Sequence, residues 1–175
     1  MRIIITGSPG TGKTIIAEKL SKQLGIPLID IKKVVNKRKL AGKRHEVDLK
    51  RLASALSFLK SKKDFVAEGH LACEVRLPAD FVFVLRTNPK TLKKRLAKRR
   101  YAKRKLEENL MAEMLDYCTQ RSEKTYRKKP LELDTSGLTV AACVSKIIKA
   151  IKQKKKRLDS VDYSGELRAY LRPGR

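Results

Sequence analysis

The sequence has few cysteines and no long apolar run, and each shortage narrows the class of protein. Its three cysteines, Cys73, Cys118 and Cys143, are far apart and show no CxxC spacing. This argues against a disulfide framework or a zinc site and fits a reducing, cytoplasmic location, with the cysteines as small core residues. The longest apolar runs, such as residues 81–85, cannot span a bilayer. The N-terminal run Ile3-Ile4-Ile5 is too short for a signal peptide.

Acidic residues are also scarce, with 18 Asp and Glu against 43 Lys and Arg, so the formal net charge is +25. A strongly basic protein tends to bind phosphate groups, such as those of a nucleotide, RNA, DNA or an anionic membrane. A membrane surface is not expected, because no predicted helix has a basic face opposite exposed aromatic residues. The 175 residues, 41% of them hydrophobic, predict one domain with a packed core.

Short apolar segments alternate with helical patterns, which predicts an α/β fold with a mainly parallel sheet of about five strands. The expected strands are residues 2–6, 27–31, 65–67, 81–85 and 131–133. The expected helices are residues 13–24, a segment capped by Asp48, residues 88–99, a long helix over residues 102–127, and residues 139–156. After residue 156 the pattern fails, so residues 157–175 are expected to form a loose basic tail.

One strong motif occurs in the chain, at residues 7–14. The segment Gly-Ser-Pro-Gly-Thr-Gly-Lys-Thr matches the phosphate-loop pattern G-x-x-x-x-G-K-[ST], with a strand before it and an amphipathic helix after it. Glycines let backbone N–H groups surround phosphates, and the helix N-terminus adds its positive dipole end. Lys13 is expected to reach the β- and γ-phosphates, and Thr14 to place its hydroxyl on Mg²⁺. The alternative is a glycine-rich turn that binds nothing.

A second candidate site follows the strand that ends near Ala67. The carboxyl ends of parallel strands face the ligand, so Glu68 is expected near the Mg²⁺ held by Thr14. Glu68 could also orient an attacking water, and His70 could hold a water or a phosphate oxygen. The alternative is that Glu68 and His70 are ordinary exposed loop residues.

Much of the positive charge lies in two stretches without any acid. Residues 32–44 carry seven bases, and residues 86–105 carry eleven, including Arg95, Arg99 and Arg100. In a nucleotide kinase the first stretch would adjoin the acceptor and the second would span a lid that closes over ATP. Arginine forks grip phosphates and stabilise charge in the transition state. Most of these bases are expected on solvated helix faces, and some of them could bind RNA.

Several segments together resemble the archaeal and nuclear adenylate kinase family, of the coilin-interacting nuclear ATPase type. The resemblance covers about residues 1–152 and rests on Gly7 to Thr14, Glu68-Gly69-His70, Phe83 to Thr87, Arg95 to Tyr101, and Leu133-Asp134-Thr135. It implies a P-loop nucleoside monophosphate kinase-like fold in a single domain over residues 1–156. Within that domain it implies an acceptor region at about residues 30–52 and a lid at about residues 98–108.

The resemblance also implies an activity, ATP + AMP ⇌ 2 ADP with Mg²⁺, and a slower ATPase. It implies a role in maturing the small ribosomal subunit, with ribosomal RNA and ribosomal protein uS11 as partners. Carried over by position, Lys13, Glu68, His70 and Arg99 would act in catalysis, and Thr14 and Glu68 would hold the metal. The ATP-binding residues would be Gly10, Thr11, Gly12, Lys13, Thr14, Ile15 and Arg99.

Two alternatives to a metabolic adenylate kinase stay open. One is an ATP-dependent ribosome-assembly factor whose kinase activity is incidental, and the surplus positive charge favours it. The other is a small-molecule kinase with a different acceptor, because a phosphate loop identifies a ligand and not a reaction.

Overall fold

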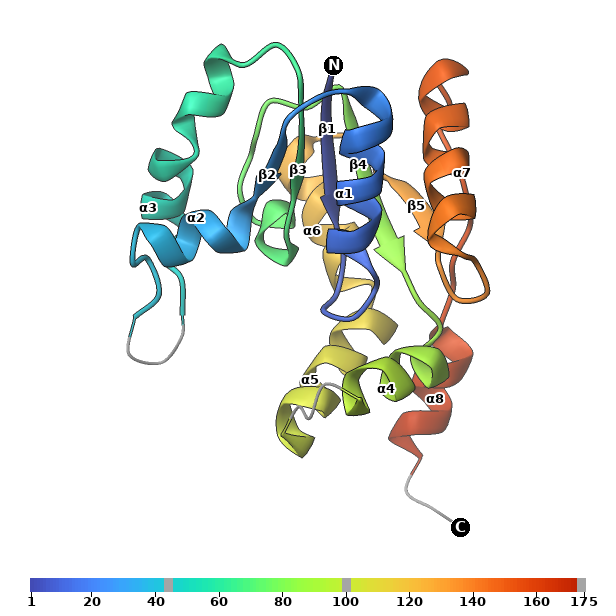
Figure 1. Ribbon diagram of the computed structural model, residues 1–175. Helices are drawn as coiled ribbons and strands as arrows, with labels where there is room; N and C mark the ends of the chain where they lie inside the picture. Colours follow the sequence, from blue (N-terminus) through green and yellow to red (C-terminus); the bar gives the residue numbers. More distant parts are fainter. Residues whose placement is uncertain (43–45, 99–101, 173–175) are drawn as a thin grey trace.

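A parallel sheet forms the centre of the protein. The computed structural model describes residues 1–42, 46–98 and 102–172, and within them five strands form one sheet in the order β2-β3-β1-β4-β5 (Figure 1). The strands are β1 (Arg2–Thr6), β2 (Leu28–Asp30), β3 (Phe65–Glu68), β4 (Phe81–Arg86) and β5 (Leu131–Asp134). All four neighbouring pairs are parallel. The predicted fold class and all five predicted strands are confirmed.

Helices cover both faces of this sheet. One face is covered by α1 (Lys13–Leu24) and α7 (Val140–Lys152), which lie side by side in Figure 1. Their apolar residues Ile16, Leu20, Val144 and Ile147 pack with Ile3 and other strand residues in one core cluster. This packing follows from sequence, because those helix residues recur at the three- and four-residue spacing of a helix face.

The opposite face is covered by shorter elements. They are α2 (Ile31–Lys37), α3 (Leu49–Ala55), the 3₁₀ helices η1 (Ser57–Ser61) and η2 (His70–Cys73), and α6 (Tyr117–Tyr126). Asp48 caps α3, as predicted, because its carboxylate accepts hydrogen bonds from the backbone N–H groups of Lys50 and Arg51. Cys73, Cys118 and Cys143 are all buried and unpaired, which confirms their expected place in the core.

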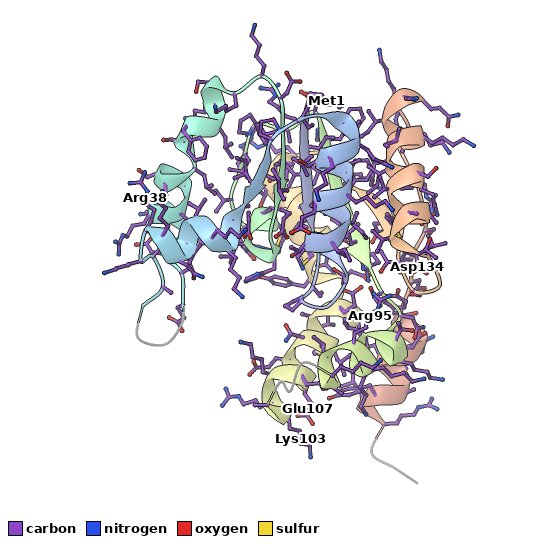
Figure 2. The ribbon with its side chains drawn as sticks, viewed as in Figure 1. Met1, Arg38, Arg95, Lys103, Glu107 and Asp134 are labelled. Atoms are coloured by element: carbon purple, nitrogen blue, oxygen red, sulfur yellow. The ribbon has the colours of Figure 1, made fainter. Side chains whose placement is uncertain are left out.

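A helical lobe lies beyond the carboxyl ends of the strands, close to the loop that follows β1 (Figure 1). It consists of α4 (Pro89–Ala97), α5 (Lys103–Met114) and α8 (Ser164–Leu171). Its own small core contains Leu92, Leu96, Leu110, Met114 and Tyr163. In Figure 2 the side chains of Lys103 and Glu107 extend outward from this lobe, whereas Arg95 lies where the lobe meets the sheet.

The prediction of one long helix over residues 102–127 was wrong. The chain forms α5 and α6 with a break between them, where Asp116 adopts the left-handed conformation at φ 54°. The buried guanidinium of Arg86 explains the break, because it is ion-paired to Glu113, the Asp116 carboxylate and Glu132. A continuous helix pattern in sequence carries no sign of this ion-pair network, whose members come from β4, α5, β5 and the turn before α6.

The expectation of a loose tail after residue 156 was also wrong for the part that the structure describes. The backbone N–H of Asp159 donates to Glu132 O at 3.0 Å, and the Asp159 carboxylate accepts from Lys146 Nζ at 2.8 Å. Tyr163 is buried, and its ring lies 5.1 Å from the guanidinium carbon of Arg86. These contacts fix the segment against the sheet and place α8 in the lobe. Within the described ranges, no helix is both long enough and apolar enough to cross a membrane.

Candidate functional site

The loop between β1 and α1 has the backbone geometry that a phosphate-binding loop needs. Gly10 and Gly12 both have φ of 94°, a region that side chains with a Cβ rarely occupy. Gly12 is the N-cap of α1, so the first backbone N–H groups of the helix open toward the loop. Ser8 and Thr11 are buried, and the Thr11 hydroxyl donates to Ser8 O at 2.9 Å, which holds the loop closed on itself.

Lys13 lies folded across this loop. Its ammonium donates to Gly7 O and to Ser8 O, each at 2.9 Å. Burial lowers the pKa of Lys13, while the Glu68 carboxylate works in the opposite direction. Two loop carbonyls therefore fix the Lys13 ammonium inside the loop, where it would contact an anion bound by the loop.

Thr14 and Glu68 meet beside the loop. The Thr14 hydroxyl donates to Glu68 Oε1 at 3.1 Å, although the residues come from α1 and from the end of β3. Burial raises the pKa of Glu68, and the nearby Lys13 charge opposes that rise. A hydroxyl and a carboxylate oxygen are the donor types that Mg²⁺ prefers, so this pair fits such an ion together with nucleotide phosphates.

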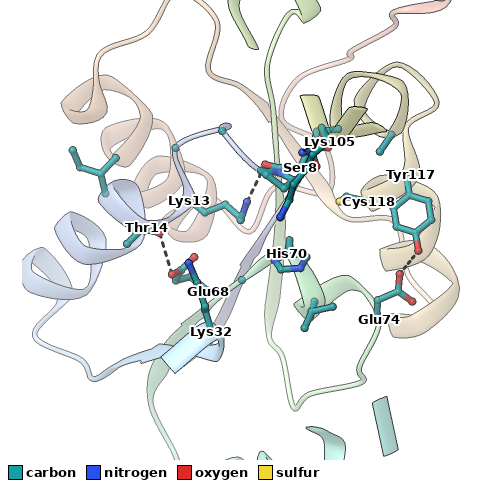
Figure 3. A pocket seen from close by; sticks show the side chains of 18 of the residues that line it. Ser8, Lys13, Thr14, Lys32, Glu68, His70, Glu74, Lys105, Tyr117 and Cys118 are labelled. Carbon is teal, nitrogen blue, oxygen red and sulfur yellow. Dashed lines mark hydrogen bonds between the residues drawn. The ribbon is translucent and has the colours of Figure 1, made fainter. Parts of the chain in front are cut away.

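His70 begins η2, two residues after Glu68. Its ring is exposed to the cavity beside the loop, as Figure 3 shows. The surrounding protein and the cations Lys13 and Lys105 lower the pKa of His70 to about 4. Both cations disfavour a second positive charge nearby. His70 is therefore a neutral imidazole at pH 7.

Two cavities flank the loop among the described residues. The first, of about 760 Å³, lies between the loop, η2, α5 and α6 (Figure 3). The second, of about 360 Å³, lies between the loop, α4 and the start of α7. Gly10, Gly12 and Ile15 line both cavities, so the two meet at the phosphate loop.

Arg95 and Thr135 form part of the second cavity. The Arg95 guanidinium donates to Thr135 O at 3.1 Å and to the Thr87 hydroxyl at 3.3 Å. The Thr135 hydroxyl in turn reaches Thr11 O at 3.3 Å. The end of β5 is thereby tied to the phosphate loop, and one arginine of α4 is fixed beside it.

The structure brings most of the residues predicted from sequence to this place. The first cavity is lined by Glu68, His70 and the predicted ATP-binding residues from Gly10 to Ile15 except Thr11, which lines the second cavity. Arg99 and part of the predicted lid lie outside the described residues. From the described part of the predicted acceptor region, Lys32 lines the first cavity. Lys105 belongs to the predicted lid, and Arg95 to the basic stretch at residues 86–105. The predicted site residues did not include the following cavity residues: Glu74, Asn109, Ala112, Tyr117, Cys118 and Thr135.

Most of those missed residues had no sequence signal. Tyr117 and Glu74 reach the cavity only because α6 packs against η2, a contact between segments more than forty residues apart. Thr135 is the exception, since it directly follows β5 and the carboxyl ends of parallel strands face the ligand.

Comparison with known proteins agrees with this geometry. A family model described as "AAA domain" matches residues 3–116. A Methanocaldococcus jannaschii protein named "Putative adenylate kinase" is 39% identical over 178 residues, covering 98% of this chain and 97% of that protein. A Pyrococcus furiosus protein of the same name is 35% identical over 181 residues, covering 99% of each chain.

Solved structures show the same fold at low sequence identity. Shikimate kinase from Acinetobacter baumannii, in complex with shikimate, superposes with a TM-score of 0.67 at 19% identity, covering 88% of this chain and 94% of that one. Shikimate kinase from Bacteroides thetaiotaomicron gives a TM-score of 0.58 at 17% identity, covering 87% and 98%. At such identities the likeness establishes the fold alone.

Proposed function

The chain belongs to the AAA domain family and to the family of the archaeal proteins named "Putative adenylate kinase", and from this premise we propose that it is an adenylate kinase. It transfers the γ-phosphoryl group of ATP to AMP, giving two molecules of ADP, and hydrolyses ATP more slowly when no acceptor is bound. The observation that carries the proposal is the pair of cavities that meet at one phosphate loop.

Two cavities on opposite sides of the loop suit an in-line transfer. The donor nucleoside occupies the cavity beside Arg95 and Thr135, and the acceptor occupies the larger cavity beside His70. Both nucleotides then direct their phosphates at the loop from different sides. Phosphoryl transfer needs little covalent help from the protein, so positioning the two phosphates and neutralising their charge supply most of the catalysis.

The residues at the loop divide these tasks. Lys13 leaves the carbonyls of Gly7 and Ser8 and donates to the β- and γ-phosphates instead. Thr14 and Glu68 would hold Mg²⁺, which would neutralise charge on those phosphates. Arg99 of the predicted lid adds a second cation over ATP, in keeping with the resemblance that the sequence shows.

Glu68 and His70 also account for a slow ATPase. A carboxylate and a neutral imidazole on the acceptor side of the loop can orient a water where the AMP phosphate would otherwise lie. The neutral imidazole accepts a hydrogen bond from that water and so aligns its lone pair with the γ-phosphate. AMP excludes the water, so transfer to AMP replaces hydrolysis when both substrates are present.

The test measures ADP formed from ATP and Mg²⁺ with no acceptor, and then with each nucleoside monophosphate in turn. We expect AMP to stimulate ADP formation most strongly. Lys13→Ala should lower the rate by about 10³-fold, whereas Lys19→Ala, on the exposed side of the same helix, should leave it unchanged. Unchanged ADP formation in the Lys13→Ala protein would refute the proposal.

A second function is favoured by the positive charge, which ATP and AMP do not account for. The net charge of +25 suits a protein that also binds ribosomal RNA, with uS11 as a protein partner, during assembly of the small subunit. RNA binding through several phosphates should weaken steeply with salt, with a log–log slope of about −0.7 per phosphate on single strands. ATP turnover stimulated only by RNA and uS11, and not by AMP, would make assembly the main output. A flat salt response would refute RNA binding.

A further inference from the structure

An aromatic side chain from α6 forms part of the wall of the larger cavity. Tyr117, at the start of α6, lines that cavity and is 46% exposed. In Figure 3 its ring stands beside the cavity, with the hydroxyl directed toward Glu74. The proposed transfer reaction, as described above, assigns no role to this ring.

The ring is held by a hydrogen bond from its hydroxyl to Glu74, and Glu74 is in turn ion-paired with Arg121. The Tyr117 hydroxyl donates to Glu74 Oε1, and the Arg121 guanidinium donates two hydrogen bonds to Glu74 Oε2. Glu74 is largely buried, with 9% of its side chain exposed, so its carboxylate depends on these partners. Tyr117 therefore presents a fixed face to the cavity at little further cost in side-chain entropy.

The cavity also changes character along its length. Near the loop it is cationic, with Lys13, Lys32 and Lys105 in its lining. Toward α6 its lining contains Leu71, Tyr117 and Cys118, and the one carboxylate there, Glu74, is bound to Arg121 and to the Tyr117 hydroxyl. This lining suits a ligand with an anionic group at one end and a flat, weakly polar group at the other.

From this arrangement we propose that Tyr117 is the stacking wall for the base of the acceptor nucleotide, and that Arg121 and Glu74 are positioning residues for it. This rests on the proposed kinase function, because the acceptor phosphate must point at the loop. The base then lies against η2 and α6, and not within the basic segment at residues 32–44 where the sequence alone would place the acceptor.

Stacking of a base on an aromatic ring is worth enough to be measured, and loss of the ring weakens binding by about tenfold or more. We expect Tyr117→Leu to raise the KM for AMP about tenfold and to leave the KM for ATP unchanged. The kcat should also stay unchanged, because the base makes the same contact in the ground state and the transition state. Tyr117→Phe keeps the ring and loses only its anchor, so its effect should be smaller.

A matched control comes from α8. Tyr170 has 45% exposure, close to that of Tyr117, and lies outside the lining of both cavities. Tyr170→Leu should therefore leave every constant unchanged. Arg121→Leu should raise the KM for AMP by about threefold through loss of the anchor, and Arg121→Lys should restore part of that loss.

Equilibrium dialysis of AMP against the wild-type protein and the Tyr117→Leu variant separates the two proposals. Weaker AMP binding by the variant supports the stacking role even if no phosphoryl group is transferred, and in that case only the proposed function fails. Equal AMP affinity in the two proteins overturns the stacking role, whatever the catalytic activity. Failure of the wild-type protein to bind AMP or any other nucleoside monophosphate overturns it as well.

Discussion

Replacing Arg86 should destabilise the protein more than any change on its charged surface. The guanidinium is 1% exposed and pairs with Glu113, which is equally buried, and with the partly exposed Asp116 and Glu132. Burial alone would lower the pKa of Arg86, but these three carboxylates outweigh it and raise that pKa. Arg86→Leu leaves the Glu113 carboxylate buried with no cation, a loss of about 4 kcal/mol in the free energy of unfolding.

Urea unfolding followed by circular dichroism measures this loss. With a slope of about 2 kcal/mol per molar urea, the midpoint should fall by about 2 M. Arg104→Leu is the control, because the Arg104–Glu108 pair is solvent-exposed and should change stability by less than about 0.5 kcal/mol. The double variant Arg86→Leu/Glu113→Leu should be more stable than Arg86→Leu alone, since it leaves no orphaned charge at position 113. A midpoint within about 0.5 M of wild type for Arg86→Leu would refute the reasoning.

Three further results are expected. Gly7→Ala should cost about 3 kcal/mol of unfolding free energy, because its Cβ would press on Leu85 O. Gly25→Ala should cost about 1 kcal/mol, since no atom lies within 4 Å of its Cβ and only its positive φ is strained. Thermal denaturation of the two variants compares these losses. Tyr163→Ala should cost about 3 kcal/mol and release α8, seen as faster amide exchange in residues 164–171 but not in α7. Burial raises the pKa of Glu74, but the hydrogen bonds from Arg121 and Tyr117 outweigh burial and lower that pKa. The ionised Glu74 carboxylate therefore stabilises the fold fully above the pKa of the unfolded chain, and this stabilisation is lost as the pH falls through the pKa of the folded protein. The stability difference between wild type and Glu74→Gln should therefore shrink from pH 7 to pH 3 in urea titrations, and a constant difference would contradict this.

The sheet was predictable because its signals are local. Three of the strands, β1, β3 and β4, are short runs with β-branched or aromatic residues. Ile3-Ile4-Ile5 and the run at residues 81–85 are apolar on both faces, as strands covered on both sides must be. The loop at residues 7–14 was predictable for the same reason, since its glycines and its lysine are adjacent in sequence. The position of Glu68 followed from one topological rule about strand ends.

The missed features all depend on contacts between distant segments. The helix break at Asp116 is fixed by a guanidinium from β4, and helix propensity carries no information about that partner. The segment at residues 158–172 was expected to be loose because its own pattern is weak. The segment is ordered because Asp159 hydrogen-bonds to Glu132 of β5 and because the Tyr163 ring packs against Arg86. Neither contact can be predicted from the spacing of residues in the sequence.

The partners of Arg86 are synthesised after β4, so this arginine cannot be buried in an ion pair when its own strand is first made. The chain emerges N-terminus first, so β4 is complete well before Glu113, Glu132 and Tyr163 have been made. Until then the Arg86 guanidinium has no carboxylate with which to form an ion pair, and it must remain hydrated. The edge of β4 that pairs with β5 therefore stays open until residues 131–134 have been synthesised. Nascent protein without that segment would expose an unpaired strand edge, the kind of surface on which chaperones and aggregation act.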